Sequence, residues 1–226
     1  MKALFKHVDD FTLNYDIEST TDKVTGKRVY LTPEGDSFPS VTTVLGELKK
    51  ESILAWRKRV GEKEANKIST KASRRGTSVH TMCEDYLNNE FNPNKFMPID
   101  YETFKSIQPI LDEHLNNIYA QEVGLYSKHL KLAGRVDCVA EFNGKLSIID
   151  FKTSLKPKKR EWIDNYFMQE AAYAIMFEER TGIPINQLVT IIAVDNNPPQ
   201  IFIESRNTWV KPLLNAIEDY HRKYST

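Results

Sequence analysis

The chain has few cysteines, since only Cys83 and Cys138 occur among its 226 residues. Two thiols are too few for a disulfide framework, a four-cysteine zinc site or an iron–sulfur cluster held by cysteine alone. Long apolar runs are also lacking, and no stretch approaches the roughly 20 apolar residues of a membrane-spanning helix. Asp9 and Asp10 precede any sustained apolar run, so we expect no export signal, no membrane segment and a cytoplasmic, reducing location.

An excess of either charge is lacking too, because 31 basic residues balance 31 acidic ones. Any nucleic acid would therefore be held by local basic surfaces and not by the overall charge. Residues 49–75 contain ten Lys and Arg against three acids, residues 152–160 contain five against none, and residues 84–122 contain eight acids against two bases. This distribution fits nucleic-acid binding, or simply solvated helix faces.

Hydropathy patterns predict a mostly helical first half and a strand-rich second half. A hairpin is predicted over residues 11–31 with its turn at 23–27, followed by the loop 32–40. Helices are predicted near 40–48, 51–69, 73–89, 101–119, 162–181 and 207–224, and strands near 121–129, 133–142, 145–153, 187–195 and 200–205.

The order of these elements predicts an α/β fold with a mixed central sheet flanked by helices. The 40% hydrophobic content suffices for one core. We therefore expect a single domain made of a hairpin extension (1–38), a helical region (39–120), a core (121–206) and a C-terminal helix (207–226).

Asn143-Gly144 predicts a two-residue type I′ turn, because both central positions of that turn need positive φ. If Phe142 pairs with Lys145, directly opposed residue numbers sum to 287. This register opposes Asp137 to Asp150 and Arg135 to Lys152 on one face of the sheet, with Val139 and Ile148 as an apolar floor.

Two opposed carboxylates repel each other unless a cation lies between them. Oxygen ligands of this kind suit Mg²⁺ or Mn²⁺, completed by waters and a substrate phosphate. Lys152 lies two residues beyond Asp150, where it could orient or help deprotonate an attacking water. The alternative is a surface hairpin with salt-bridged charges, but an Asp inside the apolar run 148–151 weighs against it.

Asp137 followed by Asp150-Phe151-Lys152, within GRVD…IIDFKTS, resembles the signature of the PD-(D/E)XK nuclease superfamily. The segment 75–80 (RGTSVH) resembles the upstream histidine motif of its RecB-like branch, and Gln169-x-x-x-Tyr173 resembles the QxxxY motif of the same branch. Within that branch the chain is similar to the mitochondrial genome maintenance exonucleases and related phage exonucleases, through PSVT (39–42), DCVAE (137–141) and GKL (144–146). The resemblance spans roughly residues 38–182.

This resemblance implies restriction-endonuclease-like topology and a metal site held by His80, Asp137, Asp150 and the carbonyl of Phe151. A histidine in the set makes Mn²⁺ a candidate beside Mg²⁺. Glu122 stands where the family has a further acidic residue near the metal. Alternatives are a buried or capping role for His80 and an ordinary strand-edge charge for Glu122.

The same resemblance implies that Gln169 and Tyr173 contact DNA, although Tyr173 could instead be core. Aromatic stacking would suit a single strand. Further DNA-binding candidates are Arg75, Arg135, Thr153, Lys156, Lys158, Lys159 and Arg160. The aromatics near these elements, any of which could also be core, are Trp56, Tyr86, Phe91, Phe96 and Tyr101.

We therefore expect a metal-dependent DNA exonuclease acting on single strands or DNA ends without sequence specificity, in a bacterial or phage-infected cell and in DNA repair, recombination or replication. Its partner would be DNA and not a membrane. Alternatives are a flap or junction endonuclease, and a non-catalytic DNA-binding module that keeps the nuclease fold.

Overall fold

The computed structural model describes residues 4–8, 17–23 and 26–224. The strands are β1 (Glu18–Thr21), β2 (Arg28–Leu31), β3 (Ser37–Pro39), β4 (Leu115–Ser127), β5 (Leu132–Phe142), β6 (Lys145–Ser154), β7 (Gln187–Val194) and β8 (Gln200–Ser205). The α-helices are α1 (Val41–Gly46), α2 (Lys50–Val60), α3 (Glu62–Leu87), α4 (Pro98–His114), α5 (Asp164–Thr181) and α6 (Arg206–Tyr224), and the 3-10 turns are η1 (Glu47–Lys49), η2 (Pro93–Lys95) and η3 (Arg160–Trp162).

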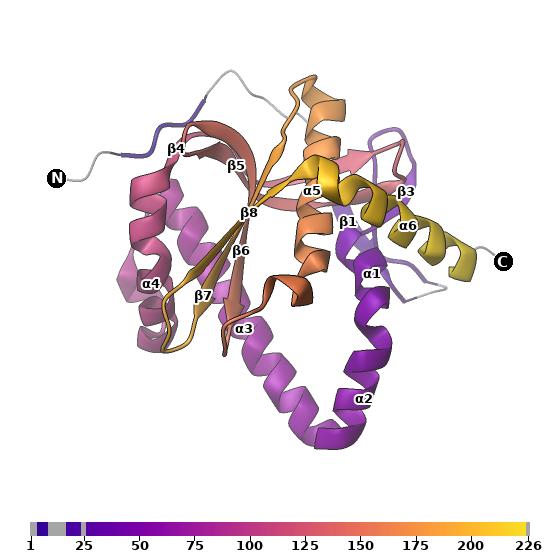
Figure 1. The fold of residues 1–226 in the computed structure, drawn as a ribbon, viewed down its shortest axis with the longest axis horizontal. Coiled ribbons are helices and arrows are strands. Elements are labelled where there is room, and N and C mark those ends of the chain that lie inside the picture. Colours follow the sequence, from indigo (N-terminus) through magenta and orange to yellow (C-terminus); the bar gives the residue numbers. More distant parts are fainter. Residues whose placement is uncertain (1–3, 9–16, 24–25, 225–226) are drawn as a thin grey trace.

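The main sheet has the strand order β4-β5-β6-β7-β8 and is antiparallel except between β6 and β7. Helix α5 makes the crossover between these two parallel strands and, with α1 and α6, covers one face of the sheet. Helices α3 and α4 cover the other face (Figure 1). The structure thus confirms the predicted α/β fold with a mixed sheet between helices.

The turn between β5 and β6 has the predicted geometry, with φ of 53° at Asn143 and 71° at Gly144. The pairs from Phe142–Lys145 to Cys138–Ile149 follow the predicted register. Val139 and Ile148 lie in the same core cluster, as expected. The ladder ends at Cys138–Ile149, however, so the expected pairs Asp137–Asp150 and Arg135–Lys152 are not formed.

The predicted helix at 101–119 was wrong in its last turn, because α4 ends at His114 and β4 begins at Leu115. Asn117 has a φ of 40°, which a right-handed helix does not allow. Leu115 and Ile118 instead enter the core beneath α4 and pair with β5, so tertiary packing decides the conformation of this segment.

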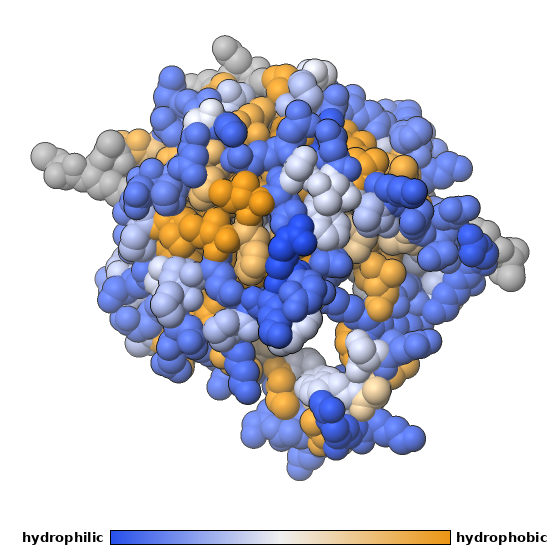
Figure 2. Space-filling view, viewed as in Figure 1, coloured by the Kyte–Doolittle hydropathy of each residue, from blue (hydrophilic) through white to orange (hydrophobic). Residues whose placement is uncertain are grey.

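The predicted break between helices at 69–73 was also wrong. The break lies at Gly61, whose φ of 85° only glycine adopts readily, and α3 then runs for 26 residues. The helices α2 and α3 form a pair that projects from the body of the molecule (Figure 1). Figure 2 shows an opening between the tip of this pair and the rest of the molecule.

The N-terminal hairpin is confirmed for residues 18–31, where β1 pairs with β2. The predicted residues 11–16 and part of the turn at 23–27 lie outside the described residues. The predicted loop 32–40 contains β3, which adds a third strand to this small sheet. The hairpin prediction missed it because Pro39 and the turn residues before it obscure a strand of three residues.

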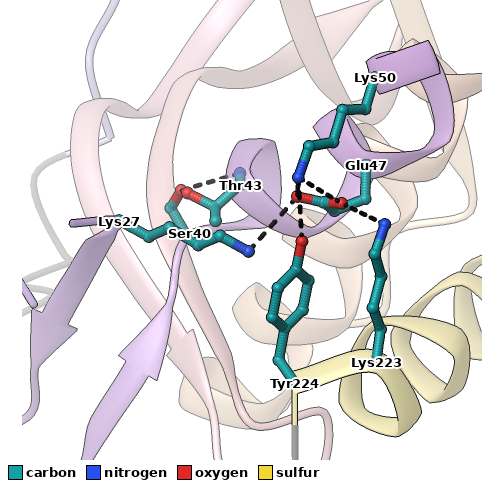
Figure 3. A network of polar contacts seen from close by, with 7 residues as sticks. All are labelled: Lys27, Ser40, Thr43, Glu47, Lys50, Lys223 and Tyr224. Atoms are coloured by element: carbon teal, nitrogen blue, oxygen red, sulfur yellow. Dashed lines mark hydrogen bonds and ion pairs between the residues drawn. The ribbon is translucent and has the colours of Figure 1, made fainter. Parts of the chain in front are cut away.

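A polar network joins the end of α6 to α1 and the small sheet (Figure 3). The carboxylate of Glu47 contacts the ammonium groups of Lys27, Lys50 and Lys223 at 3.0–3.4 Å. Although burial raises it, hydrogen bonds from Tyr224 and these lysines lower the pKa of Glu47 to about 2. The network therefore holds α6 against the elements that frame the candidate site.

Among the described helices, none combines the length and apolar character needed to cross a membrane.

Candidate active site

In β4 and β5, the alternation of side chains between the two faces of the sheet is broken at neighbouring positions. Val136 and Val139 belong to the same core cluster although their positions differ by three, an odd number, so the alternation of side chains is broken between them, where Asp137 lies. On β4, Glu122 has a φ of 46° and also interrupts the ladder. These two irregularities place the carboxylates of Glu122 and Asp137 together at the sheet surface.

Three side chains from different elements meet at this irregularity. The structure brings together ligand atoms of His80, Glu122 and Asp137 within 4.8 Å of one another, the one such group of at least three found in the described part of the chain. The His80 Nδ1 atom lies 3.4 Å from Asp137 Oδ2. The same Asp137 oxygen accepts a hydrogen bond of 2.9 Å from the backbone N–H of Phe151, which fixes the carboxylate.

The charges of this group favour a bound cation. Burial and the charge of Asp137 raise the pKa of Glu122 to about 7. Burial opposes ionisation of Asp137 as well, but His80 lowers its pKa. Two acids and an imidazole at this separation form a donor set that fits a divalent ion such as Mn²⁺ or Mg²⁺.

Asp150 lies beside this group and not within it. Its side chain is 2% exposed, forms an ion pair with Lys152, and accepts a hydrogen bond of 3.1 Å from Gln169 Nε2. Burial raises the pKa of Asp150 to about 6 despite the nearby ammonium. The charges of Asp150 and Asp137 outweigh burial and raise the pKa of Lys152, so Lys152 is a fixed cation.

Glu170 is a further acid near the site that the sequence pattern did not reveal. It is fully buried, and it forms a hydrogen bond with Thr190 on β7. Burial and the charge of Asp150 raise its pKa well above the ordinary value. The sequence does contain one signal that could have identified it, because Glu170 begins the otherwise apolar helix segment 170–177, where a charge is costly.

A pocket of about 280 Å³ opens over Asp137 and Lys152. Tyr173 forms part of its wall and is also 2% exposed and a member of the core cluster, so it is a core residue as the alternative expected, and its contact with DNA stays a prediction. The other residues that line the pocket are Arg28, Tyr30, Ser40, Thr42, His80, Gly134, Arg135 and Gln169. Arg28 and Tyr30 come from β2, Ser40 caps α1 and Thr42 lies in α1, and none of the four was predicted as a site residue.

Substitution Gly134→Ala is expected to destabilise the protein by about 1–3 kcal/mol, since it overpacks the pocket wall. An added Cβ would lie 2.9 Å from Cε1 and Oη of Tyr173, whose ring is 2% exposed, so the ring would have to shift. Thermal unfolding measures the loss. Gly46→Ala is the control, because its Cβ would meet nothing within 4 Å. Equal melting temperatures for the two variants would contradict this packing.

Glu122 should give the metal-free protein a characteristic pH dependence. Its folded pKa of about 7 exceeds the ordinary 4.5, so its stabilising effect is present below about pH 4.5 and is lost as the pH rises through 7. We expect the melting temperature in EDTA to fall over this range, and to fall less steeply in Glu122→Gln. Asp150 acts in the same direction, so part of the slope remains. If the melting temperature falls equally steeply with pH in the wild type and in Glu122→Gln, the raised pKa of Glu122 is refuted.

Of the other residues proposed to bind DNA, Arg135 lines this pocket, whereas Arg75 lines two different pockets. Arg135 is exposed and donates a hydrogen bond to the carbonyl of Glu122. Arg75 is paired with Asp195. Thr153 lies against α3, because a Cβ on Gly76 would be 4.0 Å from its Oγ1.

The basic segment after β6 is held in a defined conformation. The backbone N–H and carbonyl of Lys158 are both bonded by the amide of Gln200, at 2.7 and 2.9 Å. Arg160 forms two hydrogen bonds with Glu204, so its charge is partly satisfied within the protein. Lys156 and Lys159 are exposed.

The aromatic residues considered as stacking surfaces are mostly core. Tyr86, Phe91, Phe96 and Tyr101 pack on one another and against the cluster beneath α3 and α4. The sequence could not separate these roles, because a ring that packs in a core and a ring that stacks on a base occur in the same patterns.

Comparison with known proteins identifies the family of this chain. The family model of the PD-(D/E)XK nuclease superfamily matches residues 45–200. Mitochondrial genome maintenance exonuclease 1 of Mus musculus is 30% identical over 208 residues, which cover 83% of this chain and 60% of that protein. The Homo sapiens protein of the same name is 28% identical over 209 residues, covering 82% and 59%. The chain thus spans about 60% of the length of these relatives.

A crystal structure of a candidate exonuclease from Eubacterium rectale overlaps with a TM-score of 0.45 at 15% identity, covering 67% of this chain and 65% of that chain. The family match includes α3, β4, β5, β6 and α5, and therefore every element that supplies His80, Glu122, Asp137, Asp150 or Gln169. The chain belongs to the PD-(D/E)XK nuclease superfamily.

Proposed function

We propose that this chain is a metal-dependent DNA nuclease that acts as an exonuclease on single strands or DNA ends without sequence specificity. One observation carries the proposal: the group His80, Glu122 and Asp137 lies directly beside the buried pair Asp150 and Lys152. A cation-binding group next to a fixed ammonium suits the hydrolysis of a phosphodiester, whose transition state is rich in negative charge.

The metal would be held by His80, Glu122 and Asp137, with Asp150 and the carbonyl of Phe151 as further ligands. A divalent ion bound there would polarise the scissile phosphate and lower the pKa of a bound water. Mg²⁺ and Mn²⁺ both fit the carboxylates, and the imidazole favours Mn²⁺ more than a purely oxygen site would.

The protein side chains supply orientation and charge. Because its pKa is raised, Lys152 is protonated at neutral pH and acts on the phosphate as a cation. Gln169 holds Asp150 through its amide, which sets the direction of that carboxylate. Phe151 does the same for Asp137 through its backbone N–H. Pre-oriented groups of this kind need no reorganisation during the reaction.

The preference for ends rests on the projecting helix pair. Lys49, just before α2, donates a hydrogen bond of 2.9 Å to the carbonyl of Trp162, so the pair is fastened near its start to the segment after β6. Further along the chain, the middle of α3 lies against Thr153 at Gly76. A strand that enters through the opening between these attachments needs a free end (Figure 2).

The test is digestion of end-labelled single-stranded DNA with Mg²⁺, Mn²⁺ or EDTA. We expect cleavage with either metal, none in EDTA and none with Asp150→Ala, while Asp219→Ala on the exposed face of α6 retains activity. No cleavage by the wild-type protein with either metal would refute the enzyme, and binding without cleavage would favour a non-catalytic DNA-binding module.

Circular single strands separate the exonuclease from a flap or junction endonuclease. An enzyme that needs ends spares a circle and degrades the same strand after linearisation. Cutting of the circle, or of a flapped duplex only at its junction, would favour the endonuclease.

A further inference from the structure

Starting from Lys152 in the candidate active site, lysine ammonium groups and aromatic residues contact one another in succession. The Lys152 Nζ atom lies 5.2 Å from the centre of the Tyr166 ring. The Lys49 Nζ atom lies 5.8 Å from the same ring and donates to the carbonyl of Trp162. The Lys159 Nζ atom lies 5.3 Å from the Trp162 ring. We call Lys49, Lys159, Trp162 and Tyr166 the lysine–aromatic track.

Trp162 presents its ring to solvent from a rigid segment. It is 52% exposed, which is unusual for the largest apolar side chain. Its backbone N–H bonds to the carbonyl of Lys159 at 3.0 Å, and the adjacent Arg160 is held by Glu204. The exposure of the ring is therefore set by a fixed backbone, and the protein would lose little conformational entropy when a base stacks on it.

Positively charged lysine side chains lie close together beside the Trp162 ring. Burial and the neighbouring charge of Lys158 lower the pKa of Lys49, and the nearby carboxylate of Asp164 only partly offsets this. Lys49 is half-buried, so solvent screens the repulsion incompletely. An anion bound beside Lys49 would relieve this repulsion. A nucleic-acid phosphate next to an exposed ring meets both features at once.

We propose that the lysine–aromatic track binds a single DNA strand next to the active site, with one base stacked on Trp162 and one phosphate held by Lys49 and Lys159, whose ammonium groups both lie against Trp162. The proposal rests on the proposed function, because it takes DNA as the substrate. A strand rather than a duplex fits, since only unpaired bases expose their faces to a protein ring. Stacking on a ring is tolerant of sequence, which agrees with the absence of base selection.

Binding of fluorescein-labelled dT20, measured by anisotropy in EDTA, tests the track without cleavage. We expect Trp162→Ala to weaken binding by about 5- to 100-fold, and Trp162→Phe to restore most of the affinity. Lys49→Ala should reduce the magnitude of the slope of log K against log salt concentration by about 0.7, which is the value for one phosphate contact on a single strand. Lys49→Arg should keep the slope, and Lys211→Ala on exposed α6 is the matched control.

Wild-type affinity in Trp162→Ala, with an unchanged salt slope in Lys49→Ala, would overturn the proposal. Melting temperatures check that both variants fold, which the exposure of Trp162 favours. If the protein binds dT20 through Trp162 but does not digest DNA, the proposed function is refuted, whereas the proposed binding of DNA by the track stands. Digestion with no effect of either substitution would refute only the track.

Discussion

Substitution Asp137→Asn is expected to lower the rate of DNA hydrolysis on the order of 10³-fold or more, the usual consequence of losing a charged group central to a site. Asp137 belongs to the group with His80 and Glu122, and its charge also raises the pKa of Asp150. Asparagine can still accept the hydrogen bond from Phe151, so the fold should persist. The loss is therefore one of charge and metal affinity.

Steady-state digestion of end-labelled single strands measures this effect, with a Mn²⁺ titration to separate metal affinity from turnover. Asp219→Asn on exposed α6 is the matched control, and its activity should equal that of the wild type. Wild-type activity in Asp137→Asn at micromolar Mn²⁺ would show that the metal lies elsewhere.

Substitution Lys152→Ala should reduce both activity and stability. Loss of the ammonium next to the phosphate is expected to cost about 10²–10³-fold in rate. It also leaves Asp150 buried without its ion-pair partner, which typically destabilises a protein by about 3–5 kcal/mol. Asp150 already has a pKa of about 6, so below that pH its carboxyl becomes neutral and the stability loss should shrink.

Urea unfolding of Lys152→Ala and wild type at acid and alkaline pH measures this difference. Lys152→Arg, which keeps the charge, should recover most of the stability and little of the activity, because a planar guanidinium does not match the position of an ammonium. A loss of activity with unchanged stability at every pH would contradict the buried ion pair.

Local signals in the sequence predicted the centre of the fold well. The Asn143-Gly144 turn set the register of β5 and β6, because both residues have intrinsic access to positive φ. The register failed only beyond Cys138, where Asp137 turns to accept the N–H of Phe151. An alternating pattern cannot reveal such an irregularity, since it depends on the contact with His80 from α3.

Features that depend on distant segments were not predictable. The part of the wall formed by Arg28 and Tyr30 comes from β2 of the small sheet, far in sequence from the residues that carry the family resemblance. Trp162 was not singled out, because its exposure depends on the attachment of the segment after β6 to β8. For the aromatics near α4, which the sequence left open as stacking surfaces or core, the structure favours the core, since their clustering is a tertiary property.

Diffraction from crystals soaked in Mn²⁺, with anomalous scattering to locate the ion, tests the position of the metal directly. The predicted result is a peak coordinated by His80 Nδ1 and the carboxylates of Glu122 and Asp137, beside Asp150. A peak away from Asp137, or a His80 ring turned away from the ion, would contradict the metal site described for this chain.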